Sequence, residues 1–131
     1  MTQNLTNRAK CVGPNTQCAW FKFFPNGTST AALTIVGDTA QVASVIRTGT
    51  AGTFTVTMND AYRRVVIVPV VQHVTAADLV AQVGAITNQG GASPLSFVIR
   101  VLAGATPTDI TADANSSVMV YFASINSSTD A

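Results

Sequence analysis

The segment of residues 53–58 alternates strictly between hydroxyl-bearing and apolar side chains. Its sequence, TFTVTM, has threonine at 53, 55 and 57 and an apolar residue after each threonine. Successive side chains of a β-strand point to opposite faces, so this period of two predicts a strand with one apolar and one hydroxyl face. Because the apolar face must be buried, the segment predicts a strand that lies in a half-buried sheet.

The segments on either side are also of β type. Residues 42–47 are rich in β-branched side chains, and a short stretch with Gly49 and Gly52 joins them to residues 53–58, which predicts a hairpin with more than a two-residue loop. Residues 65–71, VVIVPVV, are almost continuously apolar, as expected of a strand covered on both faces. Pro69 cannot donate a ladder hydrogen bond, so it marks an edge strand or a bulge. Because the flanking valines are expected to be buried, we favour the bulge.

The rest of the chain adds further short strands. The expected strands are residues 18–24, 42–47, 53–58, 65–71, 79–87, 95–102 and 118–125, with 28–38 as either a strand or an extended crossing segment. Within 79–87 we expect Leu79, Ala81, Val83 and Ala85 to point inward, although alanines also suit a helix. Residues 75–78 predict a short helix or turn.

Six to eight short strands at this spacing predict an all-β fold, either an antiparallel β-sandwich or a jelly-roll-like barrel. We expect a single domain over residues 14–131, preceded by a polar N-terminal arm at residues 1–13. The alternation of apolar and polar positions predicts a core that includes Phe54, Val56, Val66, Val68, Phe97, Ile99, Val120 and Phe122.

Charged residues are few. They make up 10% of the chain, against about a quarter in a typical globular protein, and Lys10 and Lys22 are the only lysines. Surfaces of soluble monomers normally carry many lysines and glutamates, so we expect another chain to cover part of this surface, as in a homodimer or homotrimer. The scattered arginines form no basic stripe, so no nucleic-acid partner is expected. The longest apolar run is far shorter than the roughly 20 residues of a spanning helix, so no membrane partner is expected.

The cysteines suggest two alternatives. The first ten residues lack the apolar core of a signal peptide, so we expect the chain to fold in a cytoplasm. In that compartment Cys11 and Cys18 favour reduced, structural thiols, although their spacing also suits a disulfide in an oxidising environment. A metal site would need two more ligands and His73 is the single histidine, so no metal and no cofactor are expected.

No catalytic set is recognisable. His73 follows a buried-looking run and is expected to be structural rather than a general base. Asp60, Tyr62 and Arg63 stand together, but a turn-forming aspartate with a surface ion pair is the favoured interpretation. A nucleophile elbow and a phosphate-binding loop are both missing. We therefore expect no catalytic residue and no enzymatic activity.

The aromatic strand at 18–24 is the best candidate for a protein interface. Its aromatic side chains lie at strand spacing beside a Pro-Asn-Gly turn, which favours a core or an oligomer seam over a surface that stacks on sugars or bases. The arm contributes two positive charges that could pair with acidic groups of a partner. The candidate interface residues are Arg8, Lys10, Trp20, Phe21, Phe23 and Phe24.

The run SVIRTGTAGTFTVTMNDAY at residues 44–62, the valine-rich strand, the Gly/Ala/Pro loop and the terminal VMVYFASINSS resemble small virion proteins of tailed bacteriophages. Such proteins include capsid cement or decoration proteins, which bind the major capsid protein as homo-oligomers on the outside of the shell. The resemblance thus implies a non-enzymatic protein of the virion surface, assembled in the host cytoplasm. It implies no catalytic residue. A head-fibre or tail component and a carbohydrate-binding adhesin module remain open as alternatives.

Deleting residues 2–13 should leave the β domain folded, because this stretch has no core-forming period, and should weaken oligomerisation or attachment to the shell. An arm that orders on a partner loses roughly 1–2 kcal/mol of conformational free energy per residue, which new contacts must offset. Thermal unfolding and capsid binding of the truncated and full-length chains provide the measurement. Equal binding by both would mean that the arm is a terminus without a role.

Overall fold

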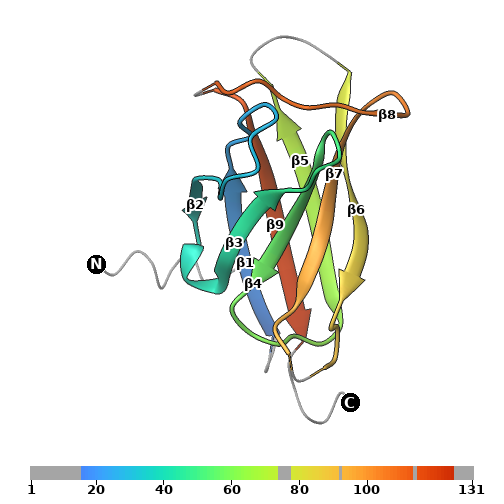
Figure 1. Cartoon of the computed structure of the whole chain (residues 1–131). Coiled ribbons are helices and arrows are strands. Elements are labelled where there is room, and N and C mark those ends of the chain that lie inside the picture. Colours follow the sequence, from blue (N-terminus) through green and yellow to red (C-terminus); the bar gives the residue numbers. More distant parts are fainter. Residues whose placement is uncertain (1–15, 74–77, 92, 114, 126–131) are drawn as a thin grey trace.

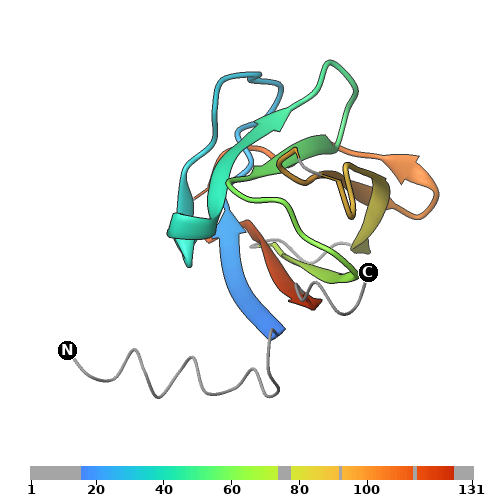
Figure 2. The ribbon, with the colours of Figure 1, turned by 90° about the horizontal axis from the view of Figure 1, so that it is seen from below.

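The computed structural model describes residues 16–73, 78–91, 93–113 and 115–125. These residues form two antiparallel β-sheets that pack face to face, so the predicted all-β sandwich is confirmed (Figure 1). The two layers are seen end-on in Figure 2. The expected arm at residues 1–13 and the helical turn expected at 75–78, apart from Asp78, lie outside the described residues.

Each sheet combines strands that are distant in the sequence. Sheet A has the order β2 (Ile35–Gly37), β1 (Thr16–Phe23), β9 (Ser117–Ile125) and β5 (Val65–Gln72). Sheet B has the order β3 (Val42–Arg47), β4 (Thr53–Met58), β7 (Ser96–Ala103) and β6 (Leu79–Thr87), and the two-residue β8 (Thr106–Pro107) pairs with β7. A 3₁₀ turn, η1 (Thr39–Gln41), leads from β2 to β3, and the predicted β3–β4 hairpin is present.

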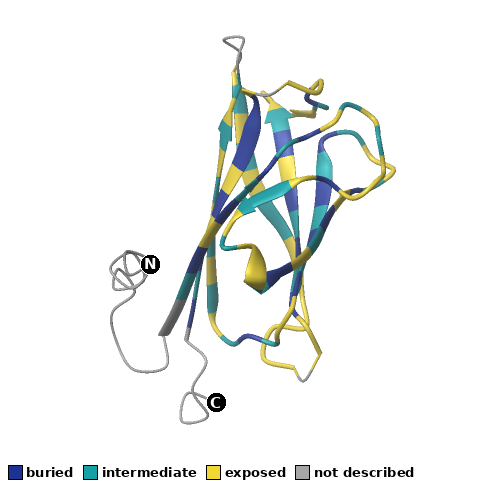
Figure 3. Ribbon diagram, turned by 90° about the vertical axis from the view of Figure 1, so that its left-hand side faces the viewer, coloured by how far each residue is buried: buried dark blue, intermediate teal, exposed yellow. Residues whose placement is uncertain are grey.

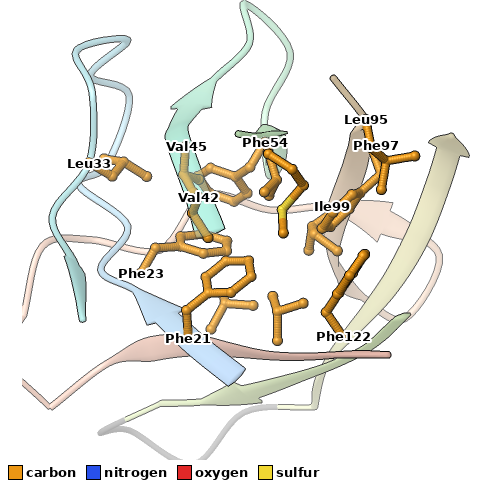
Figure 4. Close-up of a cluster of buried hydrophobic side chains, with 14 of the residues drawn as sticks. Phe21, Phe23, Leu33, Val42, Val45, Phe54, Leu95, Phe97, Ile99 and Phe122 are labelled. Carbon is orange, nitrogen blue, oxygen red and sulfur yellow. The ribbon is translucent and has the colours of Figure 1, made fainter. Parts of the chain in front are cut away.

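The core lies between the sheets and is dominated by phenylalanines. Phe23 of sheet A packs on Phe54 of sheet B with ring centroids 5.1 Å apart, and Phe97 stacks on Phe122 at 6.5 Å (Figure 4). Six of the predicted core residues are buried as expected: Phe54, Val56, Phe97, Ile99, Val120 and Phe122. The period of two therefore identifies the inner faces of β4, β7 and β9 correctly.

The prediction for β5 is wrong in two respects. Val66 and Val68 are 59 and 47% exposed rather than buried, because Val65, Ile67 and Val71 are the residues that pack against the core. The strand is consequently covered on one face and not on both. An all-apolar strand carries no alternation, so its sequence does not reveal which parity points inward.

Pro69 lies in an edge strand and not in a bulge. β5 is the last strand of sheet A and pairs with β9 without interruption from Val65 to Gln72. An edge position tolerates proline because the missing N–H can face away from the ladder. Register shifts occur elsewhere, in β3 between Val42 and Ser44 and in β6 between Val83 and Ile86. Leu79, Ala81 and Val83 face the core as predicted, whereas Ala85, within the β6 shift, is exposed.

Replacing Phe54 with alanine should lower the free energy of unfolding by about 3 kcal/mol, because the fully buried ring leaves a cavity opposite Phe23. Urea unfolding at neutral pH measures the change. Thr55→Ala, on the hydroxyl face of the same strand, is the matched control and should cost less than about 1 kcal/mol. Equal losses in the two variants would contradict the assigned strand parity.

Candidate interaction surface

The outer face of sheet A is built from three strands in register, and we call it the β1–β9–β5 face. Its side chains alternate with buried residues along β1 and β9 and with half-buried residues along β5, and Figure 3 shows the corresponding change of burial along the strands. Cross-strand pairing aligns them in three rows: Cys18, Ala123 and Val66; Trp20, Tyr121 and Val68; Lys22, Met119 and Val70.

This face is apolar and exposed. Its six large apolar side chains keep between 41 and 59% of their surface exposed: Trp20, Val66, Val68, Val70, Met119 and Tyr121. Single exposed apolar residues are common on proteins, but a contiguous patch is typical of an interaction site. Lys22, at one corner, is the only charged side chain among the nine. The β1–β9–β5 face can therefore bury apolar area against a partner at little cost in desolvated charge.

Trp20 is held in place by β2 and the residue that follows it. The Trp20 backbone N–H donates to Asp38 Oδ2 at 2.9 Å, and the Asp38 N–H donates to the Trp20 carbonyl at 2.8 Å. Gly37 has a φ of 107°, and a Cβ there would lie 2.7 Å from the Trp20 carbonyl oxygen and 3.1 Å from the indole ring. The absence of a side chain at Gly37 thus lets β2 approach the indole closely.

Cys18 and Tyr121 meet at another part of the same face. The Tyr121 hydroxyl donates to Cys18 Sγ at 3.2 Å, and Cys18 is disulfide-bonded. The expectation of reduced thiols is therefore wrong for Cys18. That expectation rested on an assumed compartment, and the compartment does not decide whether the fold brings two thiols within bonding distance. Cys11, the other cysteine, lies outside the described residues. A truncation of residues 2–10 keeps Cys11 and so separates an effect of the arm from the loss of a cysteine.

The predicted interface residues fall into different parts of the molecule. Trp20 is exposed on the β1–β9–β5 face, and Phe24 is half-buried with Lys22 Nζ 5.6 Å from its ring centroid. Phe21 and Phe23 are fully buried in the core and present no surface to a partner, so the predicted set needs correction there. Arg8 and Lys10 lie outside the described residues.

The sequence also missed members of this face. Met119 and Tyr121 lie between the buried Val118, Val120 and Phe122, so the alternation in VMVYF already places them on the opposite side. Because Val120 and Phe122 are predicted core residues, the sequence already indicates that Met119 and Tyr121 face outward. The three exposed valines of β5 carried no comparable signal, because every neighbour in their strand is apolar or proline up to Gln72.

The outer face of sheet B has a different chemistry. Its β4 contributes threonines, and the row through Thr53 continues to the exposed Arg100 and Gln82. Two large exposed apolar residues of this outer face lie on the edge strands β3 and β6: Ile46 and Val80. The two outer faces of the sandwich therefore suit different surroundings, and the β1–β9–β5 face is the one that suits a partner.

The strongest polar cluster is closed and structural. Arg47, 8% exposed, donates from Nε and Nη2 to the two carboxylate oxygens of Asp109 at 2.8 and 2.7 Å. Asp109 Oδ1 also accepts the Gly52 N–H at 2.7 Å. The remaining Arg47 nitrogen, Nη1, donates to the Thr48 carbonyl at 2.9 Å. These bonds fasten Arg47 and the β3–β4 loop to the segment after β8.

The same contacts shift the ionisation of both groups. The hydrogen bonds from Arg47, supported by the Gly52 N–H, lower the pKa of Asp109 against the opposing effect of burial. The hydrogen bond to Asp109 raises the pKa of Arg47. From the sequence Arg47 is one of several scattered arginines. Val45 and Ile46 before it are both apolar and do not reveal which parity points inward, so the burial of Arg47, where a charge requires a partner, is known only from the structure.

The segment from Asp60 to Arg63 forms a turn, as favoured from the sequence, but the surface ion pair expected with it is not formed within the described residues. Tyr62 is buried, its hydroxyl donates to Gln41 Oε1 at 2.8 Å, and its ring meets Phe122 edge-on at 4.8 Å. Burial, and secondarily the charge of Asp60, raise the pKa of Tyr62. The carbonyl groups of Asp60 and Arg63 accept hydrogen bonds from Leu95 N–H and the Ser124 hydroxyl. His73 lies half-buried directly after β5.

A hollow of about 530 Å³ lies between the β1–β2 connection and residues 112–113. Phe24, Pro25 and Leu33 line it, and Asp113 is the only charged residue among its lining groups. Asp113 Oδ1 accepts the Asn115 N–H at 2.7 Å, so this carboxylate already shapes a turn. The hollow therefore offers less to a ligand than the β1–β9–β5 face.

Other site types find no support in the described part of the chain. Three or more potential metal ligands do not cluster anywhere within residues 16–73, 78–91, 93–113 and 115–125. Over the same residues, no helix has the length and apolar character needed to cross a membrane. Comparison with protein families, curated proteins and solved structures finds no match to this chain.

Asp109→Asn should lower stability at neutral pH and flatten the acid dependence of unfolding. The folded pKa of Asp109 is depressed below the unfolded value near 3.9, so its contribution is present above that value and lost as the pH falls through the folded pKa. Urea unfolding between pH 2 and 7, a range set by these values, measures the difference. Asp78→Asn, which removes an exposed carboxylate, is the control. If Asp109→Asn left the pH dependence of the unfolding free energy unchanged, the stabilising role of the Arg47–Asp109 pair would be contradicted.

Proposed function

We propose that this chain is a non-enzymatic virion structural protein, a capsid decoration protein of a tailed bacteriophage that binds the outside of the shell and stabilises it. The observation that carries the proposal is the exposed apolar β1–β9–β5 face on a sandwich with few charges. Such a surface is poorly suited to a solitary protein and well suited to one that is buried in an assembly.

The polar groups support a structural role. The closest ion pair, Arg47 with Asp109, fastens loops inside the fold, and the Tyr62 hydroxyl is used by Gln41. The ion pair and the Tyr62 hydroxyl are thus both engaged in hydrogen bonds that hold the fold together. A protein of this design acts by surface burial, and a shell that carries many bound copies is stabilised by mass action, since the copies bind the assembled state.

The disulfide of Cys18 supports a position on the outside of a particle. Disulfides persist in oxidising surroundings, which include virion surfaces, and are rare in reducing cytoplasm. Assembly in the host cytoplasm remains compatible with this bond if the thiols are oxidised after release. The resemblance of residues 44–62 and of the terminal VMVYFASINSS to small virion proteins points in the same direction.

A carbohydrate-binding module, as in an adhesin or head fibre, is the second candidate. Trp20 and Tyr121 are cross-strand neighbours with 45 and 41% of their surfaces exposed, and adjacent aromatic rings on a sheet can stack on sugar rings. The polar side of such a site is weak, because Asp38 Oδ2 already accepts the Trp20 N–H and Val68 follows in the same row. We therefore favour the protein partner.

Purified protein should co-sediment saturably with expanded shells made from the major capsid protein encoded nearest this chain, and should raise their temperature of thermal disruption. A glycan array is the parallel arm for the second candidate. Absence of co-sedimentation with these shells, or the absence of any major capsid gene nearby, would count against the decoration role. Glycan binding with no shell binding would favour the carbohydrate module.

A further inference from the structure

We infer that the β1–β9–β5 face is covered by the same face of a second copy, related by a two-fold axis that runs parallel to β9. The inference rests on the proposed function in that it names the partner of the surface on which that function depends. A two-fold interface uses one self-complementary patch on both copies.

The patch has the asymmetry that this axis requires. β9 is its middle strand, with Met119 and Tyr121; β1 with Trp20 forms a bulky flank, and β5 with its valines forms a flank of small side chains. A two-fold axis along β9 places the β5 flank of one copy on the β1 flank of the other. Val68 then packs on Trp20 of the second copy, so large side chains meet small ones on both flanks.

The other in-plane axis fits less well. A two-fold axis perpendicular to the strands through the row of Trp20, Tyr121 and Val68 would set each of these residues on its own counterpart. The bulky flanks would then collide while the valine flanks remained apart. Interfaces pack as densely as protein interiors, so this gap disfavours the perpendicular axis.

Charge and strand edges support face-to-face packing. Lys22 lies on the β1 flank, so the axis along β9 puts the two copies of Lys22 on opposite flanks, separated by two strand spacings, about 10 Å or more. At physiological salt this distance exceeds the screening length of about 8 Å. The β5 edge contains Pro69, whose missing N–H disfavours continuation of sheet A by a second copy.

The patch covers part of the area that a standard interface buries. Three strands at about 4.8 Å and five residues at about 3.3 Å per residue, with their side chains, project roughly 300 Å². A standard interface buries about 800 Å² per partner, with an apolar core and a polar rim. The apolar residues of the β1–β9–β5 face therefore supply a core, and Lys22 at its corner and Asp38 beside it supply part of the rim.

Sedimentation analysis of the full chain from low to high micromolar concentration should show a monomer–dimer equilibrium. Val68→Asp should weaken dimerisation about 100-fold or more, since the two-fold axis buries two unpaired carboxylates per dimer. Gln82→Asp, an exposed position on the outer face of sheet B, is the matched control and should dimerise normally. Circular dichroism and thermal unfolding establish that both variants are folded.

Cross-linking tests the axis independently of affinity. Met119→Cys lies on the middle strand and should form a covalent dimer on mild oxidation, because the axis brings the two copies of residue 119 together. Val70→Cys, in the same row but on the flank, should not cross-link with itself. Efficient self-cross-linking of Val70→Cys without that of Met119→Cys would overturn the axis. A monomer at all concentrations, a trimer, or normal dimerisation of Val68→Asp would overturn the inference.

The two proposals fail in different ways. Shell binding by a strictly monomeric protein would remove the dimer and leave the decoration role standing. A dimer with the predicted cross-link that binds no shell would support the inference and remove the decoration role.

Discussion

The double pairing of β9 is the constraint on which the rest of the structure depends. β9 hydrogen-bonds to β1 on one side and to β5 on the other, so the parity of this one strand fixes which side chains of all three point inward. With Val118, Val120 and Phe122 in the core, Met119 and Tyr121 must point outward. The phenylalanine core and the exposed apolar face are therefore two consequences of the same register.

Sheet B is stabilised by the ion pair between Arg47 and Asp109 as well as by apolar packing. Arg47 occupies an inward position of β3, where a charge is costly without a partner, and Asp109 reaches it from a segment 62 residues away in sequence. The same carboxylate accepts the Gly52 N–H, and a Cβ at Gly52 would lie 2.6 Å from the Val101 carbonyl oxygen and the Thr108 nitrogen. This end of the sandwich thus depends on a residue without a side chain and on a part-buried ion pair.

The asymmetry between the outer faces connects the fold with the proposed function. Threonines, Arg100 and Gln82 on sheet B suit contact with water, while the face of sheet A holds six large, exposed apolar side chains and one lysine. The core between the sheets is buried, but this outer face still exposes apolar area that a partner can bury. Dimerisation through this face would leave the hydroxyl face of each copy, and the strand ends, available to a shell.

The sequence by itself determined the all-β class, the β3–β4 hairpin and the inner faces of β4, β7 and β9, because alternation along a single strand is a local property. It also placed Trp20 among the interface candidates. Only the tertiary structure decided the parity of the all-apolar β5, the edge position of Pro69, the burial of Phe21 and Phe23, and the pairing of Arg47 with Asp109. These features depend on which strands become neighbours, and neighbours distant in sequence leave no periodic signal within either segment.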